Sequence, residues 1–110
     1  MTTFMQGEMI EFDFSPSLGV EPAKRRPALV VSSNEFNLKT SMTLVCPITS
    51  TDNGFPLHIK LPDEIDVTGF VVTEQVRAFD LQSRQPKHIG QLNAESKFMI
   101  DVKTLIKSFL

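Results

Sequence analysis

A short apolar run led by proline stands at residues 25–31, which read RRPALVV. Proline lacks the N–H that a central strand needs, so Pro27 fits the first position of a strand. Residues 28–31 are apolar without alternation, which is typical of a strand buried on both faces. The stretch therefore predicts a buried strand with the guanidinium of Arg26 at its entrance.

Alternating side chains mark the strand expected before it. Residues 8–14 read EMIEFDF, and this period of two predicts a strand that buries Ile10, Phe12 and Phe14 on one face. The next apolar run after the central strand predicts a strand at 42–48. Shorter runs between turn residues predict further strands, at 57–60, 69–72, 75–79 and 89–92.

Two stretches carry helical signals. Residues 32–34, SSN, can cap a short helical turn at 35–38. Apolar side chains later recur at helical spacing, which predicts a helix over 94–109 with Asn93 as its N-cap. Many short strands, one terminal helix and no strand–helix alternation predict a mainly β fold, a small antiparallel barrel or curled sheet.

Length and composition limit the class of protein. A chain of 110 residues that is 41% hydrophobic and 22% charged is expected to form one globular domain over residues 1–110. Its core would be small, and dimerisation would extend it. Cys46 is the only cysteine, and we find no signal-peptide pattern and no apolar run that could cross a membrane. We therefore expect a cytoplasmic protein in a reducing environment.

Polar side chains stand at the ends of two expected strands. Arg26 precedes one strand, and Thr49 follows another. If these ends meet, a fixed guanidinium faces a fixed hydroxyl, which suits a phosphodiester because arginine offers a planar fork of donors. Arg26 would stabilise charge in the transition state, and Ser50 and Thr51 would add phosphate donors. The plainer alternatives are a solvated basic cluster and loop hydroxyls bound to nearby backbone.

The loop before Arg26 carries further charges. Lys24, Arg25 and Arg26 form a local basic patch, although the net charge of −2 argues against a broad nucleic-acid footprint. Glu21 is a candidate general base or an acceptor for a ribose hydroxyl. The alternative for Glu21 is a surface carboxylate paired with Lys24 or Arg25.

A second group of candidate RNA contacts lies further along the chain. Glu74, Gln75 and Arg77 mix acceptors and donors, and alternation along the expected strand separates Glu74 from the other two. Such groups can read the edges of unpaired bases, or they can form one structural ion pair. Phe55, beside Gly54 in a loop, is either a base-stacking platform or a hydrophobic plug.

The two histidines do not indicate a site. His58 and His88 stand apart from each other and have no Cys, Asp or Glu at metal-ligand spacing. We therefore expect no metal and no cofactor, and no pair of histidines that would act as acid and base. A glycine-rich phosphate loop is also missing from the sequence.

Taken together, the motifs resemble the MazF/PemK family of toxin endoribonucleases from bacterial toxin–antitoxin systems. The resemblance runs from residue 7 to the C-terminal helix, and it rests on seven short motifs in the family's order. No motif is specific alone. They are GE at 7–8, FDFSP at 12–16, GVE at 19–21, RPALVV at 26–31, PIT at 47–49, GFP at 54–56 and EQVRAFD at 74–80.

The resemblance implies an SH3-like barrel with a C-terminal helix, the MazF/PemK/CcdB-like plasmid-maintenance toxin fold, in a two-fold homodimer. It implies metal-independent cleavage of single-stranded RNA, often mRNA, in which a ribose 2′-hydroxyl attacks the adjacent phosphate. Arg26 and Thr49 fall on positions that stabilise the transition state, and Glu21 falls on the family's loop glutamate. The implied partner is an antitoxin whose acidic, disordered tail would cover Lys24, Arg25 and Arg26, and with which such toxins bind DNA.

Three features of the sequence depart from relatives of this fold. Pro22 stands where the family commonly has glutamine, and Val72 stands where some members have an arginine before the acidic position of Glu74. Relatives that poison DNA gyrase share a tryptophan near the C-terminus, and this chain has none. The alternatives to an endoribonuclease are a gyrase-inhibitor-like binding toxin and an RNA-binding barrel without cleavage.

Overall fold

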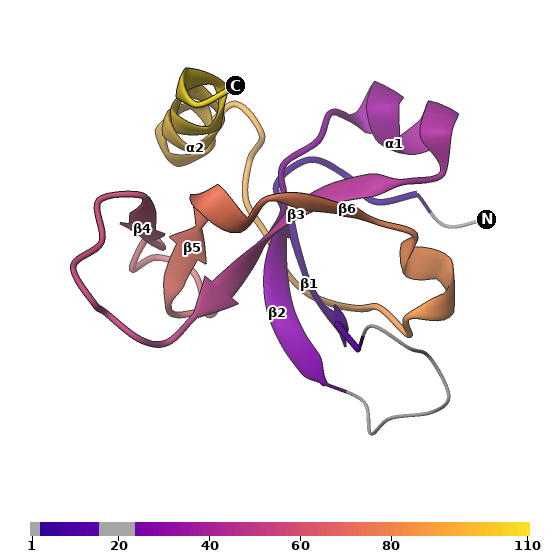
Figure 1. Ribbon diagram of the computed structural model, residues 1–110, viewed down its shortest axis with the longest axis horizontal. Coiled ribbons are helices and arrows are strands. Elements are labelled where there is room, and N and C mark those ends of the chain that lie inside the picture. The colour runs from indigo at the N-terminus through magenta and orange to yellow at the C-terminus, as the bar shows by residue number, and fades with distance from the viewer. Residues whose placement is uncertain (1–2, 16–23) are drawn as a thin grey trace.

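A computed structural model describes residues 3–15 and 24–110, so the predicted site residue Glu21 and the departure at Pro22 lie outside the described residues. Within these ranges the elements follow one another as Figure 1 shows. They are β1 (Glu8–Asp13), β2 (Arg25–Val30), α1 (Asn34–Thr40), β3 (Thr43–Thr49), β4 (His58–Lys60), β5 (Phe70–Val72), the 3-10 turn η1 (Thr73–Gln75), β6 (Arg77–Phe79), the 3-10 turn η2 (Leu81–Ser83), β7 (Lys87–Gln91) and α2 (Lys97–Ser108).

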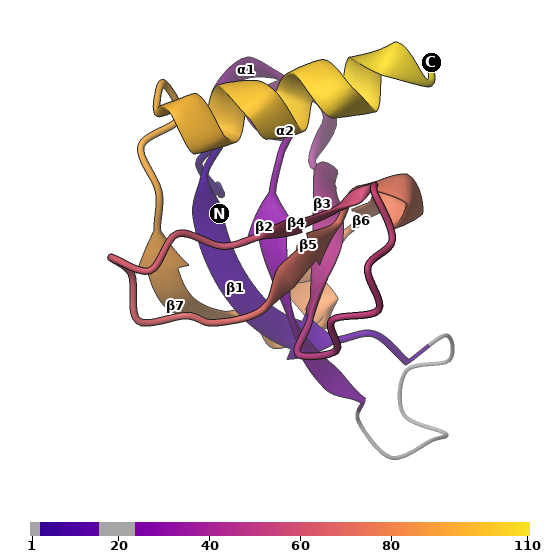
Figure 2. The same cartoon turned by 90° about the vertical axis from the view of Figure 1, so that its left-hand side faces the viewer.

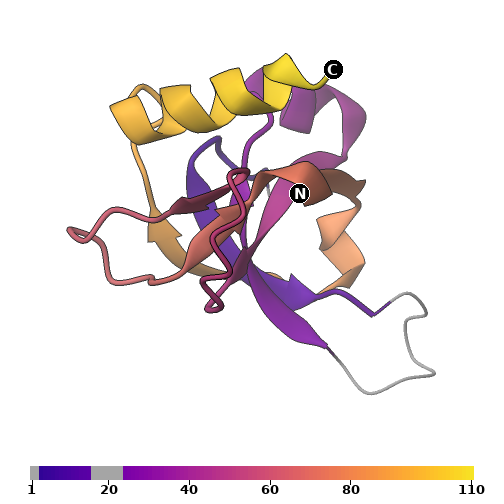
Figure 3. The same cartoon turned by 60° about the vertical axis from the view of Figure 1, so that its left-hand side comes forward.

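The strands form one antiparallel sheet in the order β4-β5-β3-β2-β1-β7. Strand β3 is its hub, because β2 pairs along one edge while β5 and β6 pair with successive parts of the other edge. The sheet is strongly bent, and β4 and β5 stand away from the β1–β2 layer (Figure 3). The prediction of a mainly β fold with one C-terminal helix is confirmed.

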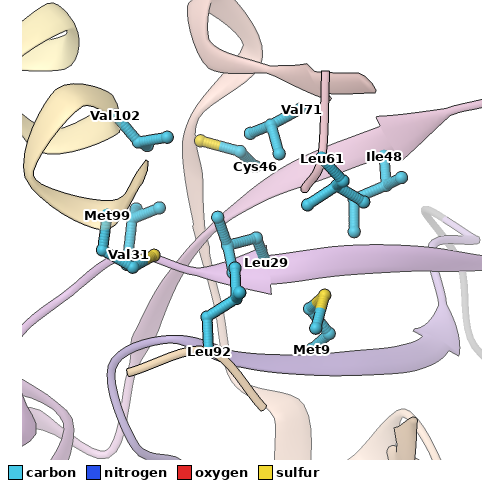
Figure 4. Close-up of a cluster of buried hydrophobic side chains, with 10 residues drawn as sticks. All are labelled: Met9, Leu29, Val31, Cys46, Ile48, Leu61, Val71, Leu92, Met99 and Val102. Atoms are coloured by element: carbon cyan, nitrogen blue, oxygen red, sulfur yellow. The ribbon is translucent and has the colours of Figure 1, made fainter. Parts of the chain in front are cut away.

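The main core lies between the sheet and α2. Figure 2 shows α2 crossing one end of β1, β2 and β3. Leu29 of β2, Cys46 of β3, Val71 of β5 and Val102 of α2 meet there with no exposed surface (Figure 4). Burial raises the pKa of the Cys46 thiol to about 12, with a smaller contribution from Glu74. This core therefore joins both parts of the bent sheet to the helix.

A second apolar cluster covers the other face of β1, β2 and β3. Phe12, Ala28 and Val45 are fully buried in it, and Phe79 is almost so. Strand β2 consequently has a core on each side, with Leu29 in the first cluster and Ala28 in the second. The prediction of a strand buried on both faces is confirmed.

Two local predictions were wrong. The strand expected at 75–79 begins only at Arg77, and Gln75 instead ends the 3-10 turn η1. The Thr73 hydroxyl donates to the carbonyl oxygen of Leu57 at 2.7 Å and so turns the chain at this point. The N-cap of α2 is Ser96 instead of Asn93. The Asn93 side chain accepts a hydrogen bond from the N–H of Glu95 at 2.8 Å and so forms a separate turn.

The other predicted elements occur with ends shifted by one or two residues. The helical turn expected at 35–38 is the longer helix α1, capped by Ser33. In the part of the chain that the structure describes, no helix is long and apolar enough to cross a membrane.

Candidate nucleic-acid interface

The register of β2 and β3 places Arg26 and Thr49 at the same end of neighbouring strands. At this end of the two strands, the last paired residues are Ala28 of β2 and Pro47 of β3. Two residues further along antiparallel strands are Arg26 and Thr49, both on the face that Ala28 and Pro47 share. Arg26 is exposed and Thr49 is half-buried. The fold thus directs the two predicted strand-end groups to one face of one sheet edge.

An aromatic ring, not a carboxylate, lies against the Arg26 guanidinium. The Arg26 guanidinium carbon is 5.4 Å from the centroid of the Phe14 ring. Phe14 stacks on Phe12 at 4.2 Å and meets Phe79 edge-on at 5.1 Å. No ion pair involves Arg26 within the described ranges. A cation held over a ring keeps its N–H donors available to a phosphate.

Two more arginines lie over the same aromatic cluster. The guanidinium carbons of Arg77 and Arg84 are 4.4 and 5.0 Å from the centroid of the Phe79 ring. Arg84 also donates to the carbonyl oxygens of Asp13 at 3.0 Å and Ser15 at 2.8 Å, so it stabilises the backbone where β1 ends. Arg77 is exposed. Arg84 could not be predicted as part of this cluster, because its partners are about seventy residues away in the chain.

The Thr49 hydroxyl oxygen is fixed by the loop that follows β3. It accepts a hydrogen bond from the N–H of Thr51 at 3.2 Å. A hydroxyl that accepts through its oxygen can still donate its own proton. Thr49 thus binds nearby backbone, as the plainer alternative expects, and retains a donor for a ligand, while Ser50 beside it is exposed.

The two basic residues before Arg26 have different surroundings. Arg25 Nε donates to Glu11 Oε1 at 3.1 Å, and its terminal nitrogen donates to the Glu11 carbonyl oxygen at 2.9 Å. Arg25 therefore forms its ion pair with a residue of β1. The Lys24 N–H donates to Asp13 Oδ1 at 3.1 Å. Hydrogen bonds from Ser15, and a further one from Lys24, lower the pKa of the Asp13 carboxyl.

The structure brings Glu74 and Phe55 to a histidine that sequence reasoning left isolated. His58 Nε2 is 2.8 Å from Glu74 Oε2, and the His58 ring meets the Phe55 ring edge-on at 5.1 Å. Gln75 is exposed in the same 3-10 turn as Glu74. Because residues 73–75 are not a strand, the predicted separation of Glu74 from Gln75 and Arg77 by alternation does not apply.

His88 also has an acidic partner. Its Nδ1 is 2.8 Å from Glu8 Oε2, between the neighbouring strands β7 and β1. The expectation that both histidines stand alone was therefore wrong. Across residues 3–15 and 24–110, no group of three or more His, Cys, Asp or Glu side chains could hold a metal ion.

An apolar groove of about 420 Å³ lies elsewhere on the molecule. None of the predicted site residues lines it. Its lining comes from the segment before β1, the β2–α1 region, β3, the segment before β6, and α2: Gln6, Val31, Ser33, Leu44, Val76, Lys103, Ile106 and Lys107. This groove therefore lies apart from the basic and aromatic residues of the predicted site.

A sequence model of the family described as PemK-like, MazF-like toxin of type II toxin–antitoxin system matches residues 5–110. This chain belongs to that family. Among relatives, the endoribonuclease toxin ChpB of Escherichia coli (strain K12) is 43% identical over 95 residues, covering 79% of this chain and 78% of ChpB. The endoribonuclease toxin MazF of the same strain is 32% identical over 97 residues, covering 88% of this chain and 86% of MazF.

Solved structures of MazF-type toxins share the fold. The MazE-MazF structure (Form-II) from Deinococcus radiodurans superposes with a TM-score of 0.84 at 29% identity, covering 99% of this chain and 96% of that chain. MazF (Form-I) from the same organism gives 0.82 at 29% identity, covering 99% and 97%. The bent sheet with its C-terminal helix is therefore the MazF-type toxin fold.

Proposed function

We propose that this MazF/PemK-type toxin cleaves single-stranded RNA at a phosphate bound by Arg26 and Thr49. Family membership and the endoribonuclease relatives make it an endoribonuclease toxin of a type II toxin–antitoxin system. The observation that supports the site most directly is the β2–β3 register, which leads to Arg26 and Thr49 on one face. Strands hold both backbones still, which favours a preorganised pair of donors.

The proposed reaction needs no metal. The ribose 2′-oxygen attacks the adjacent phosphorus, a new O2′–P bond forms, and the bond from phosphorus to the 5′-oxygen of the next nucleotide breaks. The 2′-hydroxyl proton leaves to a base, for which Glu21 is the candidate, and the 5′-oxygen gains a proton. Arg26 and Thr49 donate to the phosphate oxygens as negative charge builds there.

Other groups on this face would hold the flanking nucleotides. Arg77 lies over the aromatic cluster that also carries Arg26, so it is placed for a neighbouring phosphate. Ser50, Lys24 and Arg25 would add donors at the strand ends, with Arg25 acting from its ion pair with Glu11. The contacts to bases would come from the exposed Phe55, from Glu74 and from Gln75.

The test is cleavage of mixed single-stranded RNA in the presence of EDTA. We expect cutting by the wild-type protein, and a loss of about 10²- to 10³-fold in kcat for Arg26→Ala, as for removal of a transition-state donor. Lys39→Ala on α1 is the control, because Lys39 is 71% exposed and pairs with Glu35. If no RNA is cut, the proposed activity is wrong; RNA binding that survives Arg26→Ala without any cleavage would favour the non-catalytic barrel.

The gyrase alternative has its own assay. A gyrase-inhibiting toxin would block DNA supercoiling at concentrations that leave RNA intact. We expect no effect of this chain on supercoiling, since the sequence has no tryptophan. Inhibition of supercoiling together with intact RNA would replace the proposed function.

The proposed protein partners are a second copy of the chain and an antitoxin, in the cytoplasm. Among the solved structures with this fold are complexes such as MazE-MazF of Deinococcus radiodurans and a mycobacterial endoribonuclease bound to its cognate antitoxin. An acidic, disordered antitoxin tail would fold over Lys24, Arg25 and Arg26 and so cover the RNA face. Charge attraction of this kind weakens as salt rises, and a salt-independent affinity would contradict it.

A further inference from the structure

The pair formed by His58 and Glu74 lies beside the proposed cleavage site. His58 belongs to β4 and Glu74 to η1, which packs against β3 and β4. The two side chains are 11% and 29% exposed, and 2.8 Å separates His58 Nε2 from Glu74 Oε2. The histidine is thus almost covered, while the carboxylate keeps part of its surface open.

The burial of His58 determines which of its nitrogens carries the proton. Nδ1 is buried and has no hydrogen-bond partner among the described residues. A buried N–H without an acceptor is costly, so the favoured tautomer has its proton on Nε2, where Glu74 accepts it. His58 therefore offers no nitrogen to a ligand in this arrangement. Its effect is to hold the Glu74 carboxylate in place.

Strand pairing places this pair on the same face as Thr49. Thr49 lies opposite Phe70, and Phe70 lies opposite Lys60, so Thr49 and Lys60 share a face of the sheet. His58 lies two residues from Lys60 on β4 and therefore points to that face as well. Two strand spacings and two residues along the strand separate Thr49 from His58, about 12 Å between Cα atoms. That separation is on the order of one or two nucleotide steps.

We propose that Phe55, His58 and Glu74 form a pocket for one unpaired base close to the cleaved bond, and that Glu74 selects bases with an exocyclic amino group. This inference rests on the proposed RNA cleavage. The Phe55 ring is 44% exposed and offers a face or edge for stacking. The His58 ring contacts both partners, Phe55 edge-on at 5.1 Å between ring centroids and Glu74 through the hydrogen bond from Nε2.

The selection follows from the hydrogen-bonding chemistry of a carboxylate. An ionised carboxylate only accepts hydrogen bonds, and the hydrogen bond from His58 occupies one of its lone pairs. Adenine, cytosine and guanine each carry an amino group that can donate to the remaining lone pairs. Uracil carries a carbonyl oxygen where cytosine and adenine carry that amino group, and its one donor on this edge, N3–H, lies between two carbonyl oxygens that repel the carboxylate. A matched pair of this type is worth about 10- to 100-fold in discrimination.

The test is the base preference of each variant, read by sequencing the cut ends of a random RNA pool. Wild-type protein should disfavour uracil at one position near the cut by about 10- to 100-fold. Glu74→Gln should abolish this preference, because an amide can donate to uracil as well as accept from an amino group. The rate at uracil-containing sites should then approach the rate at other sites.

His58 is tested as the residue that positions Glu74. His58→Phe removes the N–H, so the preference against uracil should fall, whereas His58→Gln retains an amide donor and should recover much of it. His88→Phe is the matched control, because it breaks the other histidine–glutamate pair, of the same 2.8 Å length, on β7. The pool profile of His88→Phe should equal that of wild type.

The outcomes separate the two proposals. If wild-type protein cuts no RNA in the pool, the proposed function fails. If wild-type protein cuts RNA but Glu74→Gln leaves every position of the profile unchanged, the base pocket is wrong and the cleavage proposal stands. Thermal unfolding of each variant identifies misfolding, and the profile remains informative because it compares sites cut by the same protein sample.

Discussion

Two neighbouring arginines of β2 show how the pleat of a strand separates structure from chemistry. Arg25 and Arg26 point to opposite faces because successive side chains alternate. Arg25 is held by Glu11 of β1, whereas Arg26 lies over the ring of Phe14. The Arg26 guanidinium thus keeps its donors for a ligand. The sequence alone does not tell which of the two arginines forms the ion pair, because that depends on the register of β2 against β1.

The Thr49 hydroxyl is predicted to contribute through its proton. Thr49→Val keeps the shape of the side chain but removes the donor, so kcat should fall by about 10²-fold or more while the fold persists. Thr49→Ser retains the hydroxyl and should recover most of the rate. Single-turnover cleavage of one RNA oligonucleotide measures both variants. Equal rates for Thr49→Val and Thr49→Ser would remove the hydroxyl from the mechanism.

The Asp13 carboxylate, at the end of β1, should make the stability of the protein depend on pH in the acid range. Its Oδ1 accepts from the N–H of Ser15 at 2.8 Å and that of Lys24 at 3.1 Å. A hydrogen bond from the Ser15 side chain, together with these two backbone hydrogen bonds, lowers the folded-state pKa of Asp13 below the ordinary 3.8. Its stabilising contribution is therefore present above pH 3.8 and is lost as the pH falls through the folded pKa.

The measurement is the difference in Tm between pH 6 and pH 3. Asp13→Asn cannot lose a charge, so its Tm should fall less than that of wild type across this range. Lys60 pairs with Asp63 on the surface, and Asp63→Asn serves as the control with an exposed carboxylate. Parallel loss of Tm in wild type and Asp13→Asn would show that Asp13 carries no linked stability.

Side-chain partners at the site were only partly predictable from the sequence. Arg26 and Thr49 could be chosen because each stands at the end of an apolar run. The pairing of His58 with Glu74 could not, because it depends on β4 pairing with β5, and the composition of the loop between these strands does not reveal that pairing. The alternation of residues 57–60 would have placed His58 and Lys60 on one face, and that was the available signal.

At the scale of elements, the strands were predictable because burial pattern alone defines them. Strand β2 has a core on both faces and reads as an unbroken apolar run, and β1 has the expected alternation from Ile10 onward. The break at Thr73 was not predictable, because its cause is a hydrogen bond to Leu57 on another element. Turns set by such contacts leave no local signature in composition.

The end of β3 depends on a glycine of the neighbouring segment. Gly69 has φ +131°, and a Cβ at this position would lie 2.6 Å from the carbonyl oxygen of Thr49. Gly69→Ala should therefore cost about 1–3 kcal/mol in backbone strain alone and should displace Thr49. We expect a lower urea midpoint and a loss of cleavage rate that exceeds the loss of folded protein.

Gly54→Ala provides the comparison for Gly69. Gly54 also has a positive φ, +72°, but a Cβ there meets nothing within 4 Å. Its substitution should cost about 1–2 kcal/mol of left-handed strain with little effect on the rate per folded molecule. If the two variants lose rate in the same proportion, the contact between Gly69 and Thr49 has no role in activity.

For the whole molecule, the distribution of charge matters more than its total. The chain has a net charge of −2, yet Arg26, Arg77 and Arg84 gather around one aromatic cluster. Arg84 is occupied by backbone carbonyls of the β1 end. In the proposed function, three cations, Arg26, Arg77 and Lys24, would meet phosphates. This arrangement favours a short RNA segment over long duplexes.

The salt dependence of RNA binding tests that footprint. Binding to single strands loses about 0.7 in slope per neutralised phosphate, so three contacts give a slope of about −2 for log K against log salt. The ligand is an RNA with a 2′-deoxyribose at the cut site, which binds without reacting. Arg77→Gln should reduce the slope by about 0.7, whereas Lys39→Gln should leave it unchanged. A slope of about −5 or steeper would mean a much broader basic surface than one face of this protomer carries, and would require the second copy of the chain to share the same RNA.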